Sequence, residues 1–202
     1  MNLRHPLLGQ IVSATSPRPA LVESAGFTLI ELMVVLGVIG VMTAIAILVM
    51  PSALVSAKAD SGATRLQSVL RTAREQAISQ RRNVRVVFNT PNQIVVSRED
   101  VPGPGTTVLT TILLEDGMSF RLFAGLPDTP DAFGSGSATS FGTATTYKFT
   151  SEGSFVDQNG DPVNGTVFLG RTNEPLSARA VSLFGPTALI RQWRWNGRQW
   201  TS

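Results

Sequence analysis

The main feature of the chain's hydrophobic pattern is an apolar stretch near its beginning. Residues 27–50 contain 24 residues, of which only Thr28, Glu31 and Thr43 are polar. Because an α-helix rises about 1.5 Å per residue, this stretch is long enough to cross the roughly 30 Å hydrocarbon core of a bilayer. It therefore predicts a membrane-spanning helix over residues 27–50. Pro51 follows directly, and we expect it to kink or locally open the helix.

Beyond Pro51 the pattern becomes that of a helix with one buried face. Apolar side chains recur three or four positions apart, at Leu66, Val69, Leu70, Ala73, Ala77 and Ile78. Arginines such as Arg71 and Arg82 lie away from this stripe. The spacing predicts an amphipathic helix, which continues the first one and occupies residues 51–83. Asn83 and the β-branched residues after it indicate where the helix ends.

The rest of the chain, residues 84–202, has the pattern of short strands separated by turns. Strands are predicted over residues 84–88, 93–97, 108–114, 118–122, 147–150, 154–156, 165–169, 178–184 and 188–195. We expect hairpins across residues 89–92 and 115–117, and a long surface loop over residues 125–145. The predicted fold class is therefore α+β, with a long amino-terminal helix packed on a small antiparallel β head.

An acidic residue lies inside the apolar stretch, where it is costly. On insertion scales an acidic side chain at the centre of a membrane helix costs about 2.5–3.5 kcal/mol, so Glu31 requires a functional reason. Two plain interpretations are a secretory signal, cut before Lys58 after Val55-Ser56-Ala57, and a simple anchor with an accidental acid. The apolar run is longer than the ~7–15 residues of a secretory signal. Neither interpretation explains the spacing of Gly26, Phe27 and Glu31.

Residues 26–35, G-F-T-L-I-E-L-M-V-V, resemble the amino-terminal signature of the type IV pilin and type II secretion pseudopilin superfamily. The resemblance implies a pilin-like fold and a leader, residues 1–26, that a prepilin peptidase removes. The cut would fall between Gly26 and Phe27, and Phe27 would be N-methylated. Glu31 would serve assembly by pairing with the new ammonium group of a neighbouring subunit, because paired charges are tolerated in a low-dielectric medium.

The β-rich part resembles the GspH/FimT branch of this superfamily, through residues 164–169, 178–183 and 191–200. The resemblance implies a minor pseudopilin of a type II secretion pseudopilus, and alternatively a FimT-like minor type IV pilin for pilus biogenesis or DNA uptake. The implied partners are other pilins and pseudopilins, the prepilin peptidase, the inner membrane, and an outer-membrane channel or secreted cargo. The protein would cross the bacterial inner membrane once, with its carboxy-terminal head in the periplasm.

All three tryptophans lie in one arginine-rich segment near the end of the chain, residues 191–200. Asn196-Gly197 predicts a two-residue type I′ turn, in which Trp195 faces Arg198 and Trp193 faces Trp200. The segment has two interpretations. It is a structural hairpin with packed tryptophans, which we favour, or a DNA-binding patch formed by Arg191, Arg194, Trp195, Arg198 and Trp200. FimT-type pilins that bind DNA carry Gly-Arg-x-Arg, and here the second arginine is replaced by Trp200.

Composition excludes much enzyme chemistry. The 202 residues include no cysteine, and the single histidine, His5, lies in the expected leader. This excludes disulfides and thiolate zinc sites, and it leaves no imidazole for a Ser-His triad. We therefore expect no catalytic residues, no metal and no cofactor. Residues 157–161 resemble a calcium loop but lack its bidentate glutamate. The adjacent pairs Glu99-Asp100 and Glu115-Asp116 are expected to be solvated turns.

The net charge of +3 hides a strong segregation along the chain. Residues 58–85 carry seven basic and two acidic side chains, whereas residues 86–170 carry three basic and nine acidic ones. The last part, residues 171–202, carries five arginines and one acid. This alternation favours electrostatic complementarity between copies or partners over one uniform nucleic-acid surface.

Overall fold

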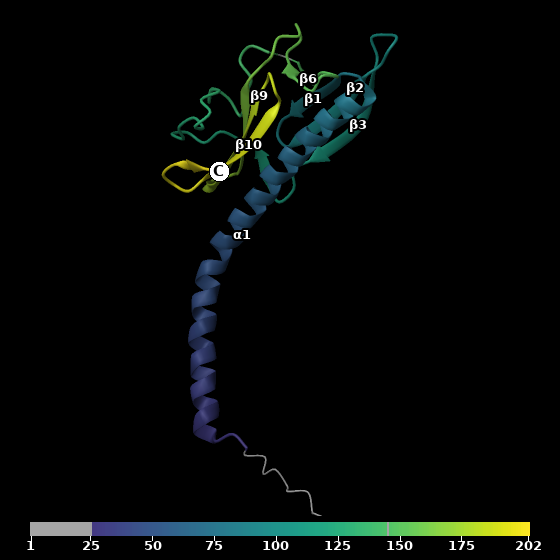
Figure 1. The fold of residues 1–202 in the computed structure, drawn as a ribbon. Coiled ribbons are helices and arrows are strands. Elements are labelled where there is room, and N and C mark those ends of the chain that lie inside the picture. Colours follow the sequence, from purple (N-terminus) through teal and green to yellow (C-terminus); the bar gives the residue numbers. More distant parts are fainter. Residues whose placement is uncertain (1–25, 145) are drawn as a thin grey trace, which may run out of the picture. The chain divides into compact units, whose positions relative to one another are not determined.

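The computed structural model describes residues 26–144 and 146–202, without the side chains of residues 48, 49, 51 and 52 (Figure 1). The expected leader therefore lies outside the described residues, apart from Gly26. The chain divides into two compact units, up to Ile45 and from Ala46 onwards.

A single helix, α1 (Leu29–Gln80), contains both predicted helical segments, and its assignment continues without a break across Pro51. Within it, Leu29–Ile47 is long and apolar enough to cross a membrane by length and composition, and all of its side chains are exposed. The helix ends where Arg81 adopts a left-handed φ of 51°. There the backbone NH of Arg82 donates to the carbonyl of Ala77 (3.1 Å), which satisfies one of the last carbonyls.

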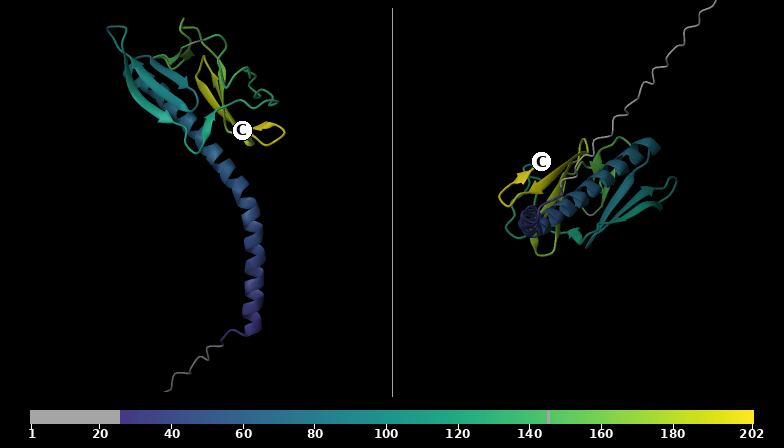
Figure 2. Two further views of the ribbon diagram at one scale, coloured as in Figure 1. Left: turned by 180° about the vertical axis from the view of Figure 1, so that it is seen from behind. Right: turned by 90° about the horizontal axis from the view of Figure 1, so that it is seen from below.

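The strands form two antiparallel sheets, as predicted for the head (Figure 2). The first sheet has the order β3-β2-β1-β6-β7, with bounds Thr106–Leu113, Gln93–Glu99, Val84–Asn89, Tyr147–Phe149 and Phe155–Val156. The second has the order β11-β10-β9-β8-β4, with bounds Trp200–Thr201, Leu189–Trp195, Glu174–Phe184, Gly165–Arg171 and Met118–Phe120. The α+β class and the antiparallel head are thus confirmed.

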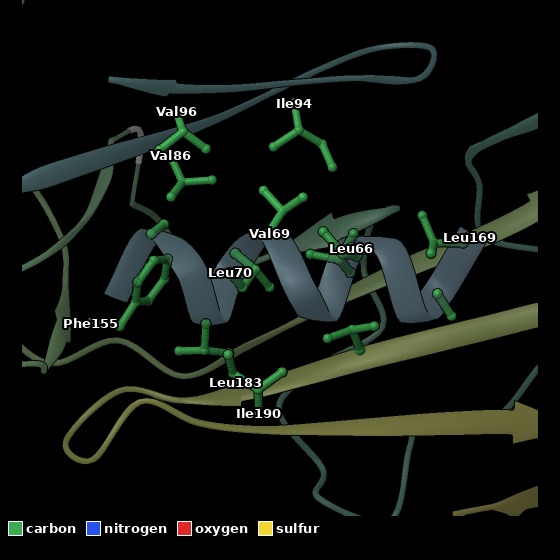
Figure 3. Close-up of a cluster of buried hydrophobic side chains, with 14 of the residues drawn as sticks. Leu66, Val69, Leu70, Val86, Ile94, Val96, Phe155, Leu169, Leu183 and Ile190 are labelled. Carbon is green, nitrogen blue, oxygen red and sulfur yellow. The ribbon is translucent and has the colours of Figure 1, made fainter. Parts of the chain in front are cut away.

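The main core lies where the carboxy-terminal part of α1 packs between the two sheets. Figure 3 shows Leu66, Val69 and Leu70 of the helix between side chains of β1 and β2 on one side and Leu183 and Ile190 of β9 and β10 on the other. The buried stripe of the helix follows a helical period through Ala59, Ala63, Leu66, Val69, Leu70, Ala73 and Ala77. Ile78, expected on this stripe, is instead exposed at 43%, because it lies about 100° around the helix from Ala77, beyond the edge of the stripe opposite Val69.

Two predictions about the segments between strands, a hairpin and a surface loop, are wrong because long-range contacts decide them. The expected hairpin across residues 115–117 is absent, since β3 pairs with β2 whereas β4 pairs with β8 of the other sheet. The expected surface loop over residues 125–145 contains β5 (Thr139–Ser140), which pairs with β8, and the buried Phe141. The ring of Phe141 occupies the space beside Gly165, where a Cβ atom would lie 2.0 Å from its Cδ1.

The two acidic pairs are ion-pair partners of the helix and of the strands, and Glu99 is not the solvated turn that we expected. Glu99 is the last residue of β2, and its carboxylate accepts a 2.9 Å hydrogen bond from Asn83 and lies 3.4 Å from Lys148 Nζ and 3.5 Å from Arg85 Nη2. Burial raises the pKa of Glu99, but the Asn83 hydrogen bond and the two cations outweigh it and hold this pKa below its usual value.

The second pair, Glu115 and Asp116, connects the turn before β4 to the helix. Lys58 Nζ lies 3.0 Å from an Asp116 oxygen, and Arg65 Nη1 lies 3.4 Å from a Glu115 oxygen. Both pairs are substantially exposed to solvent, so each contributes at most about 1 kcal/mol to stability.

Candidate processing and assembly site

The expected processing site lies immediately before α1, in a non-helical segment. Gly26 and Phe27 are both exposed, and the Phe27 side chain retains 78% of its accessible surface. A Cβ atom added to Gly26 would meet no heavy atom within 4 Å. The fold of the chain therefore imposes no need for glycine at position 26. A requirement for glycine there would have to come from a molecule that binds this segment.

Thr28 caps the helix, which sequence reasoning missed. Its hydroxyl oxygen accepts a hydrogen bond from the Glu31 backbone NH (3.2 Å), and its carbonyl accepts one from the Leu32 NH (3.1 Å). Thr28 and Glu31 therefore occupy the N-cap and N3 positions of a T-x-x-E capping pattern, which is visible in the sequence. The acid in the first turn also complements the positive end of the helix dipole.

Of the three polar side chains in the apolar stretch, that of Glu31 is the one without a hydrogen-bond partner among the described residues. The Thr43 hydroxyl donates to the Ile39 carbonyl (2.7 Å), and the Thr28 hydroxyl is used by the cap. The Glu31 carboxylate is exposed, and across residues 26–144 and 146–202 it forms no ion pair. Its remaining capacity is to accept hydrogen bonds from a cation of another molecule.

The second candidate region, the carboxy-terminal hairpin, has a different turn from the predicted one. Trp195 pairs with Trp200, not with Arg198, so residues 196–199 form a four-residue connection. The side-chain oxygen of Asn196 accepts hydrogen bonds from the backbone NH groups of Arg198 and Gln199, each at 2.9 Å. These hydrogen bonds form an Asx turn, and the centre of the hairpin lies one residue later than predicted. Gly197 adopts a φ of 96° in this turn.

Two of the three tryptophans are held inside the head. The Trp200 side chain is 7% exposed, packs beside Phe168 and donates from its indole nitrogen to the Pro127 carbonyl (2.8 Å). The Trp193 indole donates to Ser182 Oγ (2.9 Å) and to an Asp131 oxygen (3.2 Å). Both rings therefore serve packing, which supports the structural interpretation of the hairpin.

Two arginines of the predicted DNA-binding patch are already paired. Arg191 Nη1 lies 2.6 Å from an Asp131 oxygen, and Arg194 Nη1 lies 3.7 Å from an Asp60 oxygen of α1. Arg198 is exposed, and its guanidinium has no acceptor in the part of the chain that the structure describes. Binding of DNA at this hairpin stays a prediction, with one unpaired arginine to carry it.

The segment that resembled a calcium loop is a turn held by one carboxylate. Asp157 accepts hydrogen bonds from the backbone NH groups of Asn159 (2.8 Å) and Asp161 (3.0 Å). Within the described ranges, no group of three or more acidic or histidine side chains converges in a way that could hold a metal ion.

Comparisons with known proteins agree with the amino-terminal resemblance. Residues 23–47 match the family described as the prokaryotic N-terminal methylation motif, which confirms the prepilin-type signature. No curated protein matches the chain.

Two kinds of solved structure are similar to the chain. The minor pseudopilin EpsH from the type II secretion system of Vibrio cholerae shares 12% identity, over 68% of this chain and 97% of that one, with a TM-score of 0.46. The type IV minor pilin FimU of Pseudomonas aeruginosa shares 14% identity, over 71% and 92%, with a TM-score of 0.45.

Proposed function

We propose that this chain is a type IV pilin-like subunit, and more specifically a minor pseudopilin of a type II secretion pseudopilus. The observation that carries the proposal is the methylation motif, which covers residues 23–47 and includes the Gly26–Phe27 bond and Glu31. The antiparallel head on a long apolar helix supports the same role. The motif is equally compatible with a minor type IV pilin, which is the alternative.

The proposed mechanism pairs two charges, each of which would be energetically costly if it stood alone in the apolar medium. Cleavage after Gly26 creates an ammonium group at Phe27, one residue before the helix cap. Glu31 of a neighbouring subunit accepts this ammonium as its partner and thereby fixes how far one helix is shifted along the other. An unpaired charge in a low-dielectric medium is strongly unfavourable, so the pair favours one register between helices.

The proposed location follows from the same segment. Residues 29–47 span the bacterial inner membrane once, and the head lies in the periplasm, where it meets other pilins and an outer-membrane channel or secreted cargo. The protein acts in this role as a structural subunit and not as an enzyme.

Contacts of the residues before Lys58 argue against the alternative of a secretory signal. A cut between Ala57 and Lys58 would divide α1 within its length. It would also remove Ser56, whose carbonyl and hydroxyl oxygens accept hydrogen bonds from the buried Arg179 (3.2 and 2.9 Å). Residues on both sides of that bond are thus part of the same packed helix.

Processing is tested with the full chain expressed beside a prepilin peptidase. Mass spectrometry of the wild-type product is expected to show a chain that begins with N-methylated Phe27. Gly26→Val is expected to retain its leader completely, because the β-branched side chain obstructs the peptidase. Gly37→Val, where a Cβ atom also meets nothing within 4 Å, is the matched control and should be processed normally. Normal trimming of Gly26→Val contradicts the proposed cut.

Assembly is tested with Glu31→Ala. The variant is expected to be processed but to lose filament incorporation, since a neighbouring ammonium without its partner costs about 3 kcal/mol, which is on the order of a hundredfold in association. Glu75→Ala removes an exposed acid from the same helix and should assemble like the wild type. Cross-linking in membranes measures how much of each variant enters the filament. Incorporation of Glu31→Ala at the wild-type level would exclude the pairing.

A further inference from the structure

A groove of about 700 Å³ lies on the head beside the carboxy-terminal hairpin. Its walls are mostly apolar and come from three segments, with Ala53, Val55 and Ser56 of α1 facing residues 173–176 and residues 194–196. All of these residues belong to the unit that begins at Ala46. In Figure 1 the hairpin after β10 lies at the end of the β-rich part where α1 enters it.

A tryptophan of the groove wall and an arginine of the adjoining turn both have side-chain donors without an acceptor among the described residues. Trp195 lines the groove and is half-buried against Trp200 (ring centroids 5.4 Å apart), yet its indole NH has no acceptor among the described residues. Arg198, in the adjoining turn, likewise has a free guanidinium. The other tryptophans and arginines of the hairpin are paired, and the two residues with free donors lie three positions apart in the chain.

Apolar surface and positive charge coincide at this place. Leu176 lines the groove, is 61% exposed, and lies so close to the turn that a Cβ atom on Gly197 would be 3.4 Å from its Cδ2. The acid of the groove wall, Glu174, is paired with Arg171 (3.1 Å). The carboxylate of Asp60 is paired with Arg179 and Arg194. Because one carboxylate is shared by two arginines, a positive charge remains at the groove, where Arg194 lines the wall, and Arg198 in the adjoining turn adds a second cation.

The length of the chain limits how far this groove can be from the apolar segment. Ala53 follows Ile47 by six positions, and six residues span at most about 20 Å even when fully extended, and about 9 Å in a helix. The polar layer of a bilayer adds roughly 5–8 Å on each side of its hydrocarbon core. If residues 29–47 span the membrane, the groove is therefore tethered within reach of the lipid headgroups.

We propose that this groove, with Leu176 and Trp195 in its wall and Arg198 in the adjoining turn, binds the surface of an anionic phospholipid bilayer. Leu176 and the Trp195 ring enter the interfacial layer, where amphipathic rings are favoured, and Arg198 and the Trp195 NH donate to lipid phosphate or ester oxygens. The proposal rests on the proposed function, because residues 29–47 supply the anchor. A bilayer fits better than DNA, since one free arginine and an exposed leucine suit a lipid interface more than a row of phosphates.

The experiment uses the full chain reconstituted into vesicles that carry bromine on the upper part of the acyl chains, which quenches nearby tryptophan. The difference in fluorescence between the wild type and Trp195→Phe gives the emission of Trp195 alone. Vesicles of phosphatidylcholine with phosphatidylglycerol are expected to quench it, and phosphatidylcholine alone is expected to quench it less. Arg198→Ala should lower the equilibrium constant for surface contact about fivefold, from ~1 kcal/mol per basic side chain near an anionic surface.

Arg71→Ala is the matched control, because Arg71 is exposed and lies on α1 away from the groove. Leu176→Ser should lower quenching as Arg198→Ala does. Absence of quenching in anionic vesicles, or equal quenching in Arg198→Ala, overturns the proposal. So does a Trp195 signal that responds to added duplex DNA, or to protein concentration, instead of to lipid.

Flotation of the same samples separates this proposal from the proposed function. A chain that floats with the vesicles while Trp195 is not quenched overturns the lipid-binding groove and leaves the membrane anchor intact. A chain that does not float overturns the anchor, and the groove proposal with it.

Discussion

At the residue scale, Arg179 shows how the head accommodates a buried charge. Its side chain is fully buried, and each of its five N–H groups has an acceptor. Nε lies 2.5 Å from an Asp60 oxygen, while the other donors reach the carbonyls of Leu176 and Ala178 and both oxygens of Ser56. Arg179 on β9 is therefore bonded to α1 and to its own strand. This is the arrangement that makes a buried cation tolerable.

Removing the partner of this cation should destabilise the head strongly. Asp60→Ala leaves Arg179 buried without a counter-charge, and we expect the free energy of unfolding to fall by about 3 kcal/mol. Lys58→Ala, two positions earlier on α1, breaks a half-exposed pair and should cost less than about 1 kcal/mol. Urea denaturation of the full chain in detergent, followed by tryptophan fluorescence, measures both. Equal losses in the two variants contradict the role given to Asp60.

At the element scale, the turn after β9 is the point where three strands are joined. The Gly185 NH donates to the side-chain oxygen of Asn164 (2.8 Å), just before β8, and its carbonyl accepts from the Phe155 NH of β7 (2.8 Å). A Cβ atom at Gly185 would lie 2.5 Å from both the backbone nitrogen and the backbone oxygen of Val163. Because backbone atoms cannot turn away as a flexible side chain can, this approach requires glycine.

Gly185→Ala is therefore expected to lower the free energy of unfolding by about 1–3 kcal/mol, the usual cost of overpacking. Gly136→Ala is the matched control, since a Cβ atom there meets nothing within 4 Å. Thermal unfolding followed by circular dichroism compares the two variants with the wild type. A Gly185→Ala protein as stable as Gly136→Ala would show that the backbone at Val163 moves without cost.

At the scale of the whole molecule, the two units differ in the exposure of their apolar side chains. The buried apolar residues among those described run from Ala59 to Trp200, whereas the side chains of Leu29–Ile47 are exposed and, apart from Glu31 and Thr43, apolar. Every residue of the buried core therefore belongs to the unit that begins at Ala46. In the proposed function, this separation would let the helix pass from a bilayer into a filament while the head stays folded.

A chain that begins at Ala46 is accordingly expected to fold in solution and to unfold at the same urea concentration as the full chain in detergent. A chain that begins at Thr64 lacks Ala59, Asp60 and Ala63, so it exposes part of the core and loses the partner of Arg179. We expect this shorter chain to be unfolded or aggregated. Size-exclusion chromatography and circular dichroism distinguish the outcomes, and an unfolded chain from Ala46 contradicts the independence of the core.

Local pattern accounts for the parts of this protein that could be predicted. Neighbouring residues alone define the length of the apolar stretch, the acid within it and the strand segments. Helix rise, the cost of burying a charge and the strand period are enough to interpret these three features. All nine predicted strands are present within a few residues of their expected bounds. The T-x-x-E cap of α1 is also a local pattern, and it could have been predicted from the sequence.

The tertiary structure alone decided which elements meet. Strand β4 joins the second sheet, Phe141 enters the core beside Gly165, and Asp131 and Asp60 form ion pairs with two arginines of the alternative DNA-binding patch. These contacts join residues tens of positions apart, and their energies depend on burial and distance, which no local period encodes. For the same reason the unused donors of Trp195 and Arg198 could be recognised only after the partners of their neighbours were known.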